Sequence, residues 1–427
     1  MGSRKEKIKW PASIRINGDN WRVMRQLIST KEAYSIVLDS TSIISIPAEK
    51  VDLKEALGCV LKESIFADRD FPPFDRVTMD GIAVSTMAFQ SGFHELEIQG
   101  VQPAGSEPAT LLKHTSCIEV MTGAVMPIGA DAVVRYEDIQ ISNGKAQVLV
   151  PIKKGQNIHP KGHDKKRGME LLANGKRISA AEIAVLATVG KTKVWVSKYP
   201  KVAIISTGDE LVSIDQVPKP HQIRMSNSYM IQAVLKDFGL IADLHHLPDD
   251  SSISIAKITE LINKYEVLIF SGGVSMGKKD FIPMALSANQ VEQKFHGVLQ
   301  RPGKPFWFGS HQKAVVFALP GNPVSSFMCT HKYVIPWVRK QIGLSSSSND
   351  FAILGSNFTF EPALDYFLQV RVKVEKNGHK IGFPVEGKGS GDFANLLDAD
   401  AFMALPAERS VFKKGETFPI IQFRKYE

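Results

Sequence analysis

Cysteine is scarce in this chain of 427 residues, and the three that occur, Cys59, Cys117 and Cys329, lie far apart. None belongs to a Cys-x-x-Cys pair or to a cluster with histidine, so the sequence predicts neither a zinc site nor a disulfide framework. No motif surrounds any of them. We therefore interpret them as reduced structural thiols rather than as catalytic nucleophiles.

Long apolar runs are also missing. No stretch of about 18 apolar residues occurs, so we expect no membrane-spanning helix. The first residues contain no apolar core of a signal peptide, and the cytoplasm is the expected location. Apolar residues make up 44% of the chain and charged residues 22%, values that exclude the disordered, collagenous and disulfide-rich classes.

The charges are unequal: 52 lysines and arginines exceed 44 aspartates and glutamates, which gives a net charge of +8. Part of the excess lies in residues 1–28, which we interpret as an extension. Such a segment is either a nucleic-acid arm or a solvated tail, and we favour the tail. The remaining excess is typical of a protein whose ligands are anions.

Capping signals and turn signals divide the first half of the chain. Ser29 and Glu32 form a capping box that predicts a helix to about residue 38, and a second helix is expected at 52–57. From about residue 65 to 160 short apolar segments alternate with turns, and Asn143-Gly144 predicts a hairpin. A second capping box at 179–182 opens another helix. Helices therefore flank a β-rich region, as in an inserted domain.

From residue 201 onward apolar strands alternate with amphipathic helices, which predicts a parallel sheet covered on both faces. The expected strands are 202–205, 240–247, 267–270 and 314–318, and the expected helices begin near 226, 252 and 323. After a serine-rich linker at 345–348, short strands predict a small β domain. The predicted fold class is thus multidomain, α/β plus β.

Three groups of polar residues follow expected strand ends, the edge at which open parallel sheets bind ligands. They read STGDE at 206–210, SGGVSMGKKD at 271–280, and RPGKP with LPGNPVS at 301–305 and 319–325. The second is not a Walker A motif, yet its glycines, lysines and aspartate are what a pyrophosphate with Mg²⁺ requires. A rigid loop presenting Arg301 and Lys304 is suited to clamp an oxyanion. An ordinary polar turn is the alternative for each.

Seven segments together resemble the molybdopterin molybdenumtransferase family, the MoeA and gephyrin E-domain group. They read PPFDRVTMDGIAV, VMTGAVMPIGADAVV, GHDKKRG, STGDEL, SGGVSMGKKDF, RPGKPF and LPGNPVS. They occur in the family's order and cover about residues 30 to 410. One such segment is a weak signal, but seven in order are highly specific, so the chain is identified as a member.

The resemblance implies a homodimer of elongated chains with four subdomains each. The expected ranges are a basic extension at 1–28, helical dimerisation subdomain I at 29–65 and 163–198, β-rich subdomain II inserted at 66–162, molybdopterin-binding α/β subdomain III at 199–345, and β-barrel subdomain IV at 346–427. The active site is expected between subdomain III of one chain and subdomain II of the other.

It also implies a reaction. Molybdate is joined to the dithiolene of adenylylated molybdopterin, and AMP leaves with the help of Mg²⁺. Molybdopterin adenylyltransferase and molybdoenzyme apoproteins are the expected transient partners, with no nucleic acid and no membrane. One alternative is a catalytically weak scaffold that binds pterin or anchors a partner, as gephyrin-like members anchor a receptor peptide. Another is the upstream adenylylating enzyme, which the added domains disfavour.

Site residues follow by position. The catalytic residues are Asp80, Thr122, Asp164 and Glu210, and the metal ligands are Asp249 and Asp280. The pterin phosphate and AMP are expected at Ser206, Thr207, Gly272, Gly273, Ser275 and Lys279, and molybdate at Arg301, Lys304, Pro305, Ser325 and Ser390.

The chain departs from the family at several positions. Gly297 stands where some members carry lysine, and Gln369 where many carry arginine, with Arg371 two residues on along the same strand face. His163 replaces a usual glutamate, and a lone histidine is more often structural than catalytic. Arg76 is either an anion contact or a solvated side chain.

Overall fold

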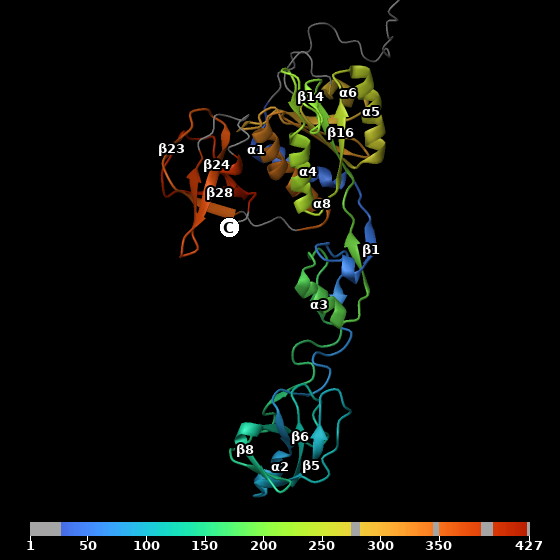
Figure 1. The fold of residues 1–427 in the computed structure, drawn as a ribbon, viewed down its shortest axis with the longest axis vertical. Coiled ribbons are helices and arrows are strands. Elements are labelled where there is room, and N and C mark those ends of the chain that lie inside the picture. Colours follow the sequence, from blue (N-terminus) through green and yellow to red (C-terminus); the bar gives the residue numbers. More distant parts are fainter. Residues whose placement is uncertain (1–26, 275–281, 345–349, 386–395, 425–427) are drawn as a thin grey trace, which may run out of the picture. The chain divides into compact units, whose positions relative to one another are not determined.

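The computed structural model describes residues 27–274, 282–344, 350–385 and 396–424. The chain divides into two compact units, each with its own core (Figure 1). The first unit takes the chain up to Ala48 and from Ser197 onward, and the second takes Glu49–Val196. Subdomain boundaries finer than this division stay predictions.

The first unit contains a six-stranded sheet of order β16-β13-β17-β21-β20-β18. Its strands are β13 (Val202–Thr207), β16 (Ala242–Leu247), β17 (Val267–Ser271), β18 (Glu292–His296), β20 (Trp307–Ser310) and β21 (Val315–Leu319). The first four in spatial order run parallel, whereas β20 is antiparallel to both of its neighbours. The predicted parallel sheet is therefore confirmed in its central strands.

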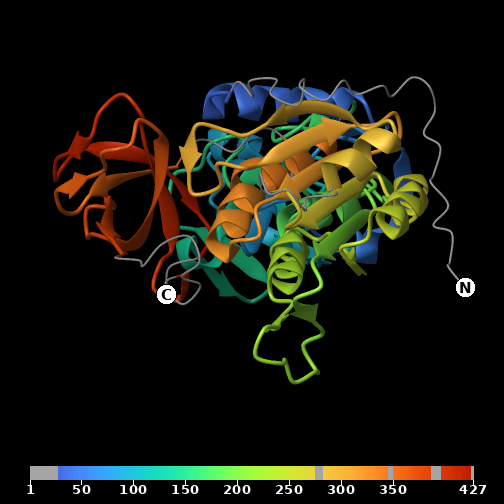
Figure 2. The same ribbon diagram turned by 90° about the horizontal axis from the view of Figure 1, so that it is seen from above.

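Helices cover both faces of this sheet (Figure 2). One face carries α1 (Thr30–Asp39), α4 (Asn227–Asp237), α7 (Pro323–Cys329), a π-helical turn (Thr330–Val334) and α8 (Ile335–Gln341). The other carries α5 (Ser251–Lys264) and α6 (Ile282–Ala288). Side chains alternate between the two cores, with Ile204 in the first and Ala203 and Ile205 in the second. Burial on both faces explains why the strands are continuously apolar.

The end of the first unit forms a small closed barrel. Its strands are β22 (Asp350–Leu354), β24 (Asp365–Val374), β25 (Lys380–Pro384), β26 (Ala401–Leu405) and β28 (Thr417–Gln422). The ring closes because β24 pairs with both β25 and β26. The short strand β19 (Gln300–Arg301) adds to β24 in parallel, and β23 (Phe358–Thr359) pairs with β27 (Val411–Phe412).

The second unit is built on a six-stranded sheet of order β7-β4-β6-β5-β9-β8. Its elements are β4 (Gly81–Val84), α2 (Thr86–Gln90), β5 (Glu95–Gln102), β6 (Ser116–Val120), β7 (Ala132–Arg135), β8 (Ile139–Ser142) and β9 (Lys145–Val148). Asn143 and Gly144 join β8 to β9 with φ of 50° and 75°, so the predicted hairpin is confirmed.

A smaller part of the second unit packs around α3 (Ala180–Thr188), whose capping box between Ser179 and Glu182 is present as predicted. Two short ribbons accompany it: β1 (Ala48–Asp52) with β12 (Lys193–Ser197), and β2 (Ile65–Phe66) with β11 (Glu170–Leu172). The helix predicted at 52–57 is wrong, because only a 3-10 turn at Leu53–Glu55 forms. Strand β1 runs up to Asp52, and the Leu53 amide donates to the Thr192 carbonyl. The backbone at the start of the predicted helix is therefore part of the β1–β12 ribbon.

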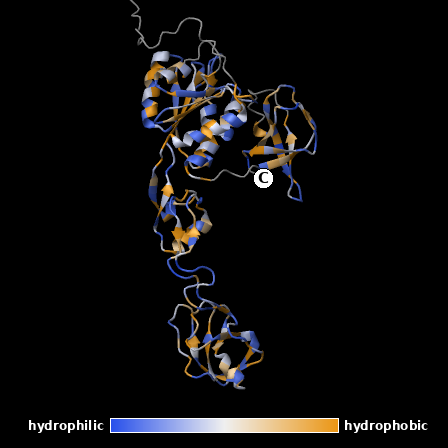
Figure 3. Ribbon diagram, turned by 180° about the vertical axis from the view of Figure 1, so that it is seen from behind, coloured by the Kyte–Doolittle hydropathy of each residue, from blue (hydrophilic) through white to orange (hydrophobic). Residues whose placement is uncertain are grey.

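Hydrophobic residues follow the central strands and alternate with hydrophilic ones along the helices (Figure 3). Among the described residues, the helices are too short or too polar to cross a membrane. Cys117 and Cys329 are buried. Burial raises the pKa of the Cys117 thiol to about 12 and that of Cys329 still further, so neither is a thiolate near neutral pH.

Candidate functional site

The parallel strands of the first unit end side by side, and the loops that follow carry predicted pterin residues. In the sheet register Ser206 pairs with Ser271, and Thr207 pairs with Leu247. Ser271 in turn pairs with Leu319. Register alone therefore brings the loops after β13, β16, β17 and β21 to one edge of the sheet, with Ser206 and Thr207 next to Gly272.

Glycines let these loops touch through their backbones. A Cβ added to Gly273 would lie 2.8 Å from Thr207 Oγ1 and 2.6 Å from the side chain of Ile282. Gly273 also has φ of +70°, a conformation that glycine adopts without strain. The Gly272 amide donates to the Leu319 carbonyl at 3.1 Å. The two glycines thus hold the loop closely against β13 and β21, at the sheet edge where phosphorylated ligands bind.

Within the part of the chain that the structure describes, Thr207 Oγ1 and Asn227 Oδ1 are buried oxygen atoms at this edge without a hydrogen-bond partner. The other end of the Asn227 amide is fully used, because Nδ2 donates to Ser271 Oγ at 3.0 Å and to the Gly321 carbonyl at 2.7 Å. A buried polar atom left unpaired costs about 1–3 kcal/mol. Both oxygens can therefore bond to a ligand or to water, the Asn227 oxygen as an acceptor and the Thr207 hydroxyl as a donor or an acceptor.

Asn227 is a site residue that the sequence analysis missed. The sequence predicted only that a helix begins near 226, and the N-cap residue of α4 is Ser226, whose side chain makes no capping hydrogen bond. The signal that pointed to a helix start was correct. What the sequence did not reveal was that this helix start lies against the loops after β17 and β21, which the Asn227 amide joins.

The carboxylates beside β13 and β16 have different surroundings. Asp250 caps α5 by accepting from the Ser252 and Ile253 amides, and Asp209 accepts from the Asp249 amide at 3.1 Å. Among the described residues, nothing hydrogen-bonds to the carboxylate of Asp249. That carboxylate is an exposed hard oxygen donor, so it fits the predicted role as a Mg²⁺ ligand.

Glu210 folds back over the loop after β13. A Cβ on Gly208, where φ is +128°, would lie 2.3 Å from the Glu210 carboxylate. The Glu210 carbonyl accepts from the Ile223 amide, which begins the short parallel pair of β14 (Leu211–Val212) and β15 (Ile223–Arg224). The predicted residues Ser275, Lys279 and Asp280 lie outside the described residues, as does Ser390.

Two exposed cations lie on the proline-flanked loop after β18. Between Arg301 and Lys304 the loop is anchored inward, because Gln300 accepts from the Tyr333 hydroxyl at 2.6 Å and donates to the Gly303 carbonyl at 3.1 Å. Arg301 lies 5.8 Å above the Phe360 ring. The loop thus presents both cations to solvent on a fixed backbone, with the half-buried Pro305 directly after them. Ser325 is buried in α7.

The departures on β24 have clear surroundings. Gln369 has a buried side-chain oxygen without a hydrogen-bond partner. Arg371, on the same face of the strand, donates to the Asp398 carboxylate at 3.0 Å and to its carbonyl at 3.2 Å. The guanidinium of Arg371 therefore already has an anionic partner. After β18, a Cβ on Gly297 would lie 2.5 Å from the Leu27 side chain, so a side chain there requires Leu27 to move.

In the second unit the structure brings Asp80 and Thr122 together. The Thr122 amide and hydroxyl both donate to Asp80 Oδ1, at 2.6 and 2.8 Å. These bonds, the amide first, hold the pKa of Asp80 below its usual range. Next to it, Tyr136 donates to Glu119 at 2.8 Å, and burial with this contact raises the pKa of Tyr136 to about 12.

Asp164 contacts two histidines. His159 Nε2 lies 2.8 Å from Asp164 Oδ1, and His163 Nδ1 lies 3.6 Å from the same oxygen. Asp164 and the Asp80–Thr122 pair flank one strand, β3 (Arg76–Val77). On one side β3 pairs with β10 (Ile158–His159), and on the other Val77 bonds to Gly123 and Ala124. Three of the four predicted catalytic residues thus lie in the second unit.

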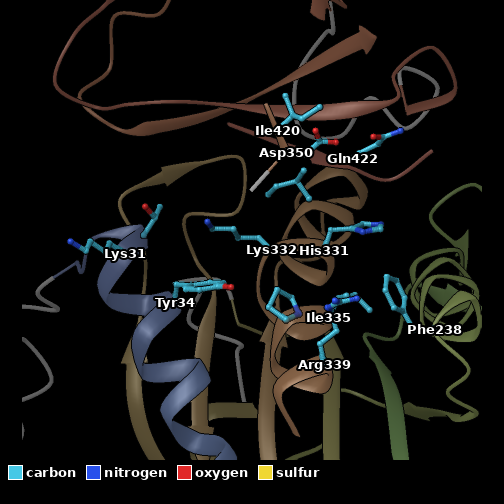
Figure 4. A pocket seen from close by; sticks show the side chains of 13 residues that line it. Lys31, Tyr34, Phe238, His331, Lys332, Ile335, Arg339, Asp350, Ile420 and Gln422 are labelled. Atoms are coloured by element: carbon cyan, nitrogen blue, oxygen red, sulfur yellow. The ribbon is translucent and has the colours of Figure 1, made fainter. Parts of the chain in front are cut away.

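A separate open pocket of about 790 Å³ lies in the first unit between α1, α8 and the barrel (Figure 4). Its side chains include Lys31, Tyr34, Lys332 and Arg339. Burial lowers the pKa of Lys332, and the nearby Asp365 opposes that effect. Lys332 Nζ lies 4.9 Å above the Tyr34 ring. Of the predicted catalytic, pterin, molybdate and metal residues that the structure describes, none lines this pocket.

These features define a class: a multidomain α/β protein whose sheet edge suits a phosphorylated ligand. Residues 28–190 match the MoeA N-terminal region (domain I and II), residues 203–340 the probable molybdopterin binding domain, and residues 352–423 the MoeA C-terminal region (domain IV). Among curated relatives, a molybdopterin molybdenumtransferase of Synechocystis is 38% identical over 86% of this chain and 93% of its own length. One of Staphylococcus aureus is 32% identical over 93% and 96%.

Solved structures agree. Two structures of the molybdopterin biosynthesis MoeA protein from Pyrococcus horikoshii have TM-scores of 0.79 and 0.74, at 29% and 31% identity. They cover 94% and 93% of this chain and 100% of their own. The chain belongs to the MoeA family of molybdopterin molybdenumtransferases, the transferases of molybdenum cofactor biosynthesis. The predicted family and fold class are confirmed.

Proposed function

We propose that this protein inserts molybdate into adenylylated molybdopterin and releases AMP in a Mg²⁺-dependent reaction, giving the molybdenum cofactor. The observation that carries the proposal is the sheet edge of the first unit. There a closely packed glycine loop lies where a parallel sheet binds phosphorylated ligands, beside two buried oxygens, Thr207 Oγ1 and Asn227 Oδ1, that have no hydrogen-bond partner among the described residues. The names of the curated relatives support this substrate.

In this proposal each group has a task. Ser206, Thr207, Gly272 and Gly273 hold the pterin phosphate and AMP, with Asn227 added from the structure. Arg301 and Lys304 collect molybdate, because two exposed cations on a rigid loop attract an oxyanion before any bond forms. Ser275 and Lys279 belong to the same pterin-phosphate set, and Pro305, Ser325 and Ser390 to the molybdate set.

Asp249 and Asp280 are the proposed Mg²⁺ ligands. When bound, Mg²⁺ neutralises charge on the phosphate oxygens of the anhydride that is cleaved. The exposed carboxylate of Asp249 fits this assignment, since its neighbours Asp209 and Asp250 are occupied by backbone amides. The carboxylates are harder donors than the thiols of this chain, which favours Mg²⁺ over a thiophilic metal.

Asp80, Thr122, Asp164 and Glu210 are proposed to act on the bound substrates. Because two donors lower the pKa of Asp80, this residue stays ionised and is a weak base. An ionised carboxylate with one oxygen held in place orients a donor group of the substrate through its other oxygen. Asp80 is therefore an orienting group in this proposal.

We also propose a homodimer in the cytoplasm, in which the second unit of one chain completes the site on the first unit of the other. Molybdopterin adenylyltransferase would supply the substrate, and molybdoenzyme apoproteins would receive the product. Size-exclusion chromatography with light scattering tests the dimer. A chain that is monomeric while fully active would contradict it.

One assay tests the reaction itself. Purified protein is mixed with adenylylated molybdopterin and Mg²⁺, with and without molybdate, and AMP release and active cofactor are followed. We expect AMP release that depends on both molybdate and Mg²⁺. Binding of the pterin without molybdate-dependent AMP release would contradict the proposal, whereas an Asp280→Ala variant that folds but does not turn over would support it.

A second candidate function is a scaffold that anchors a partner. The observation in its favour is the open pocket of Figure 4, which is lined by Lys31, Lys332 and Arg339 and contains none of the predicted site residues. The departures Gln369 and Gly297 also belong to this alternative. The same assay separates the two functions, because a scaffold without turnover releases no AMP.

A further inference from the structure

The ribbon of β3 and β10 places Arg76 directly opposite His159. The two strands are antiparallel, with His159 paired to Arg76 and Ile158 paired to Val77. Side chains of directly paired residues lie on the same face of a ribbon. As a result Arg76 Nη2 lies 3.1 Å from His159 Nδ1, while His159 Nε2 lies 2.8 Å from Asp164 Oδ1.

These two contacts fix the protonation of the ring. A guanidinium has only donors, so Nδ1 of His159 must be the acceptor and carries no proton. In the neutral ring Nε2 then carries the proton and donates a hydrogen bond to Asp164 Oδ1. A protonated Asp164 donating to Nε2 would put the ring proton on Nδ1, against the donors of Arg76. The chain of bonds therefore runs in one direction, from Arg76 through His159 to Asp164.

The backbone around Asp164 is independently held. The Asp164 amide donates to the Phe71 carbonyl at 2.9 Å, and the Gly162 amide donates to the Pro72 carbonyl at 2.9 Å. The Lys161 amide donates to Asp75 Oδ1 at 2.8 Å. These bonds fix the position of the Asp164 backbone, but they do not fix its side-chain torsion angles. The bond from His159 is what selects one orientation of the carboxylate.

We propose that His159 is a positioning residue for Asp164, with its tautomer set by Arg76. His159 holds Oδ1 of the ionised carboxylate and leaves Oδ2 to face the substrate. The proposal rests on the proposed function, in which Asp164 is one of the catalytic residues. It gives Arg76 a role that differs from both sequence interpretations, since its guanidinium is neither free for an anion nor merely solvated.

A metal ion is the rival explanation for this cluster. His159, His163 and Asp164 offer ligand atoms that lie within 4.8 Å of one another. A metal needs a lone pair on a ring nitrogen, however, and the lone pair of His159 Nδ1 is covered by Arg76 while Nε2 carries a proton. To bind a metal through Nε2, His159 would have to change tautomer and expel Arg76. The observed contacts therefore favour positioning over metal binding.

Three variants test the positioning role by kinetics. In His159→Gln the amide oxygen accepts from Arg76 and the amide nitrogen donates to Asp164, whereas His159→Leu does neither. We expect His159→Leu to lower kcat by about 10–100-fold with KM for molybdate nearly unchanged, because a misdirected carboxylate loses its alignment. His159→Gln should recover most of kcat. His163→Gln, in the same loop, should leave kcat within about twofold, since exposed ion pairs contribute little.

A spectroscopic readout makes the test independent of turnover. In protein with ¹⁵N-labelled histidine rings, the signal absent from His159→Gln belongs to His159, and we expect its Nε2–H tautomer. Arg76→Met should convert this signal to a mixture of tautomers. An Nδ1–H tautomer in the unaltered protein would overturn the proposal, and so would uptake of one Zn²⁺ per chain that shifts the His159 and His163 signals together.

The two hypotheses fail in different ways. If the unaltered protein releases AMP but His159→Leu is as active as His159→Gln, the positioning role is wrong and the proposed function stands. If the unaltered protein releases no AMP, the proposed function is wrong. In that case the NMR experiment still decides the positioning role. The His159 tautomer in the unaltered protein, and its change in Arg76→Met, show whether Arg76 determines the tautomer of the ring that holds Asp164.

Discussion

The backbone amide and the hydroxyl of Thr122 donate to the same carboxylate oxygen of Asp80, at 2.6 and 2.8 Å. Two residues 42 positions apart thus form one unit, in which a loop amide and a side chain fix a carboxylate beside β3. Both bonds favour the ionised form, which is why the pKa of Asp80 lies below its usual range.

Removing the hydroxyl should release Asp80 in part. In Thr122→Val we expect the pKa of Asp80 to rise toward its ordinary value and AMP release to fall by about tenfold, since one of two orienting bonds is lost. The amide bond remains, so the loss is incomplete. The folded pKa is the lowered one, so the stabilisation by this contact is present above the unfolded pKa and is lost as the pH falls through the folded pKa.

Carboxyl ¹³C NMR of the Asp80 side chain, titrated from pH 7 downward, measures the shift. Thr122→Ser is the matched control, because it keeps the hydroxyl and should keep both the pKa and the activity. An unchanged Asp80 titration in Thr122→Val would show that the hydroxyl does not stabilise the anion.

Adjacent aspartates provide a test of the proposed Mg²⁺ site. Asp249→Asn should raise the Mg²⁺ concentration needed for half-maximal AMP release by at least about tenfold, because an amide oxygen is a weaker ligand than a carboxylate. Asp250→Asn should leave the Mg²⁺ dependence unchanged and reduce thermal stability slightly, since Asp250 accepts from two amides at the start of α5.

Mg²⁺ titrations of both variants, with melting curves beside them, separate the two roles. Because the residues are neighbours, a general disturbance of the loop would affect both titrations alike. Equal Mg²⁺ requirements in Asp249→Asn and in the unaltered protein would remove Asp249 from the metal site.

A buried histidine predicts how stability depends on pH. His331 has a buried Nε2 without a hydrogen-bond partner, and burial lowers the pKa of His331 from 6.5 to about 4. Between pH 6.5 and about 4, His331 is therefore protonated in the unfolded chain but neutral in the folded chain. The free energy of unfolding should fall by about 3 kcal/mol as the pH drops from 6.5 to 4, at 1.36 kcal/mol per unit.

His331→Phe should remove most of this fall, because phenylalanine does not titrate and the site is aromatic, with the Phe327 ring centre 4.6 Å from that of His331. Urea unfolding at a series of pH values measures the effect. His221→Gln is the control, since His221 is exposed and its replacement should leave the pH dependence of the free energy of unfolding unchanged. If the free energy of unfolding depends on pH equally in His331→Phe and in the unaltered protein, the prediction is contradicted.

The sequence was informative where local signals decide structure. The caps at Ser29 and Ser179 and the hairpin at Asn143-Gly144 depend on residues within a few positions of one another. The full capping box forms at Ser179, Ser29 caps α1 by accepting from the Glu32 amide, and the hairpin forms as predicted. The strand-end loops of the first unit were placed correctly for the same reason. A parallel sheet aligns strand ends, so Ser206 and Gly272 meet without any further information.

Contacts between distant segments were not predictable. Asn227 reads as a helix cap until its amide is seen to join Ser271 to Gly321, and Arg76 reads as a surface charge until β10 pairs with β3. The helix expected at 52–57 does not form because of such a contact. The backbone there pairs β1 with β12 and bonds Leu53 to Thr192. Each depends on which segments the fold brings side by side, and no local pattern encodes that.

Gly81 offers the sharpest test of close packing beside the candidate site. A Cβ at Gly81 would lie 1.9 Å from the Val134 carbonyl oxygen of the neighbouring strand β7. Gly81→Ala should therefore force β4 and β7 apart. We expect it to lower the free energy of local opening of these two strands by about 3 kcal/mol. Because Asp80 precedes Gly81, activity should fall with it.

Gly100 is a closely matched control, for it has the same φ of 159° and nothing within 4 Å of an added Cβ. The φ angle is thus equal in the two positions, whereas the available space differs. Gly100→Ala should introduce the backbone strain of this φ but no clash with a neighbouring strand, so it should destabilise the protein less than Gly81→Ala does. Amide hydrogen exchange measures both effects locally, through the amides of β4 and β7 for Gly81→Ala and through those of β5 and β6 for Gly100→Ala. If the two variants open equally easily, the contact of Gly81 with Val134 does not hold the strands that support Asp80.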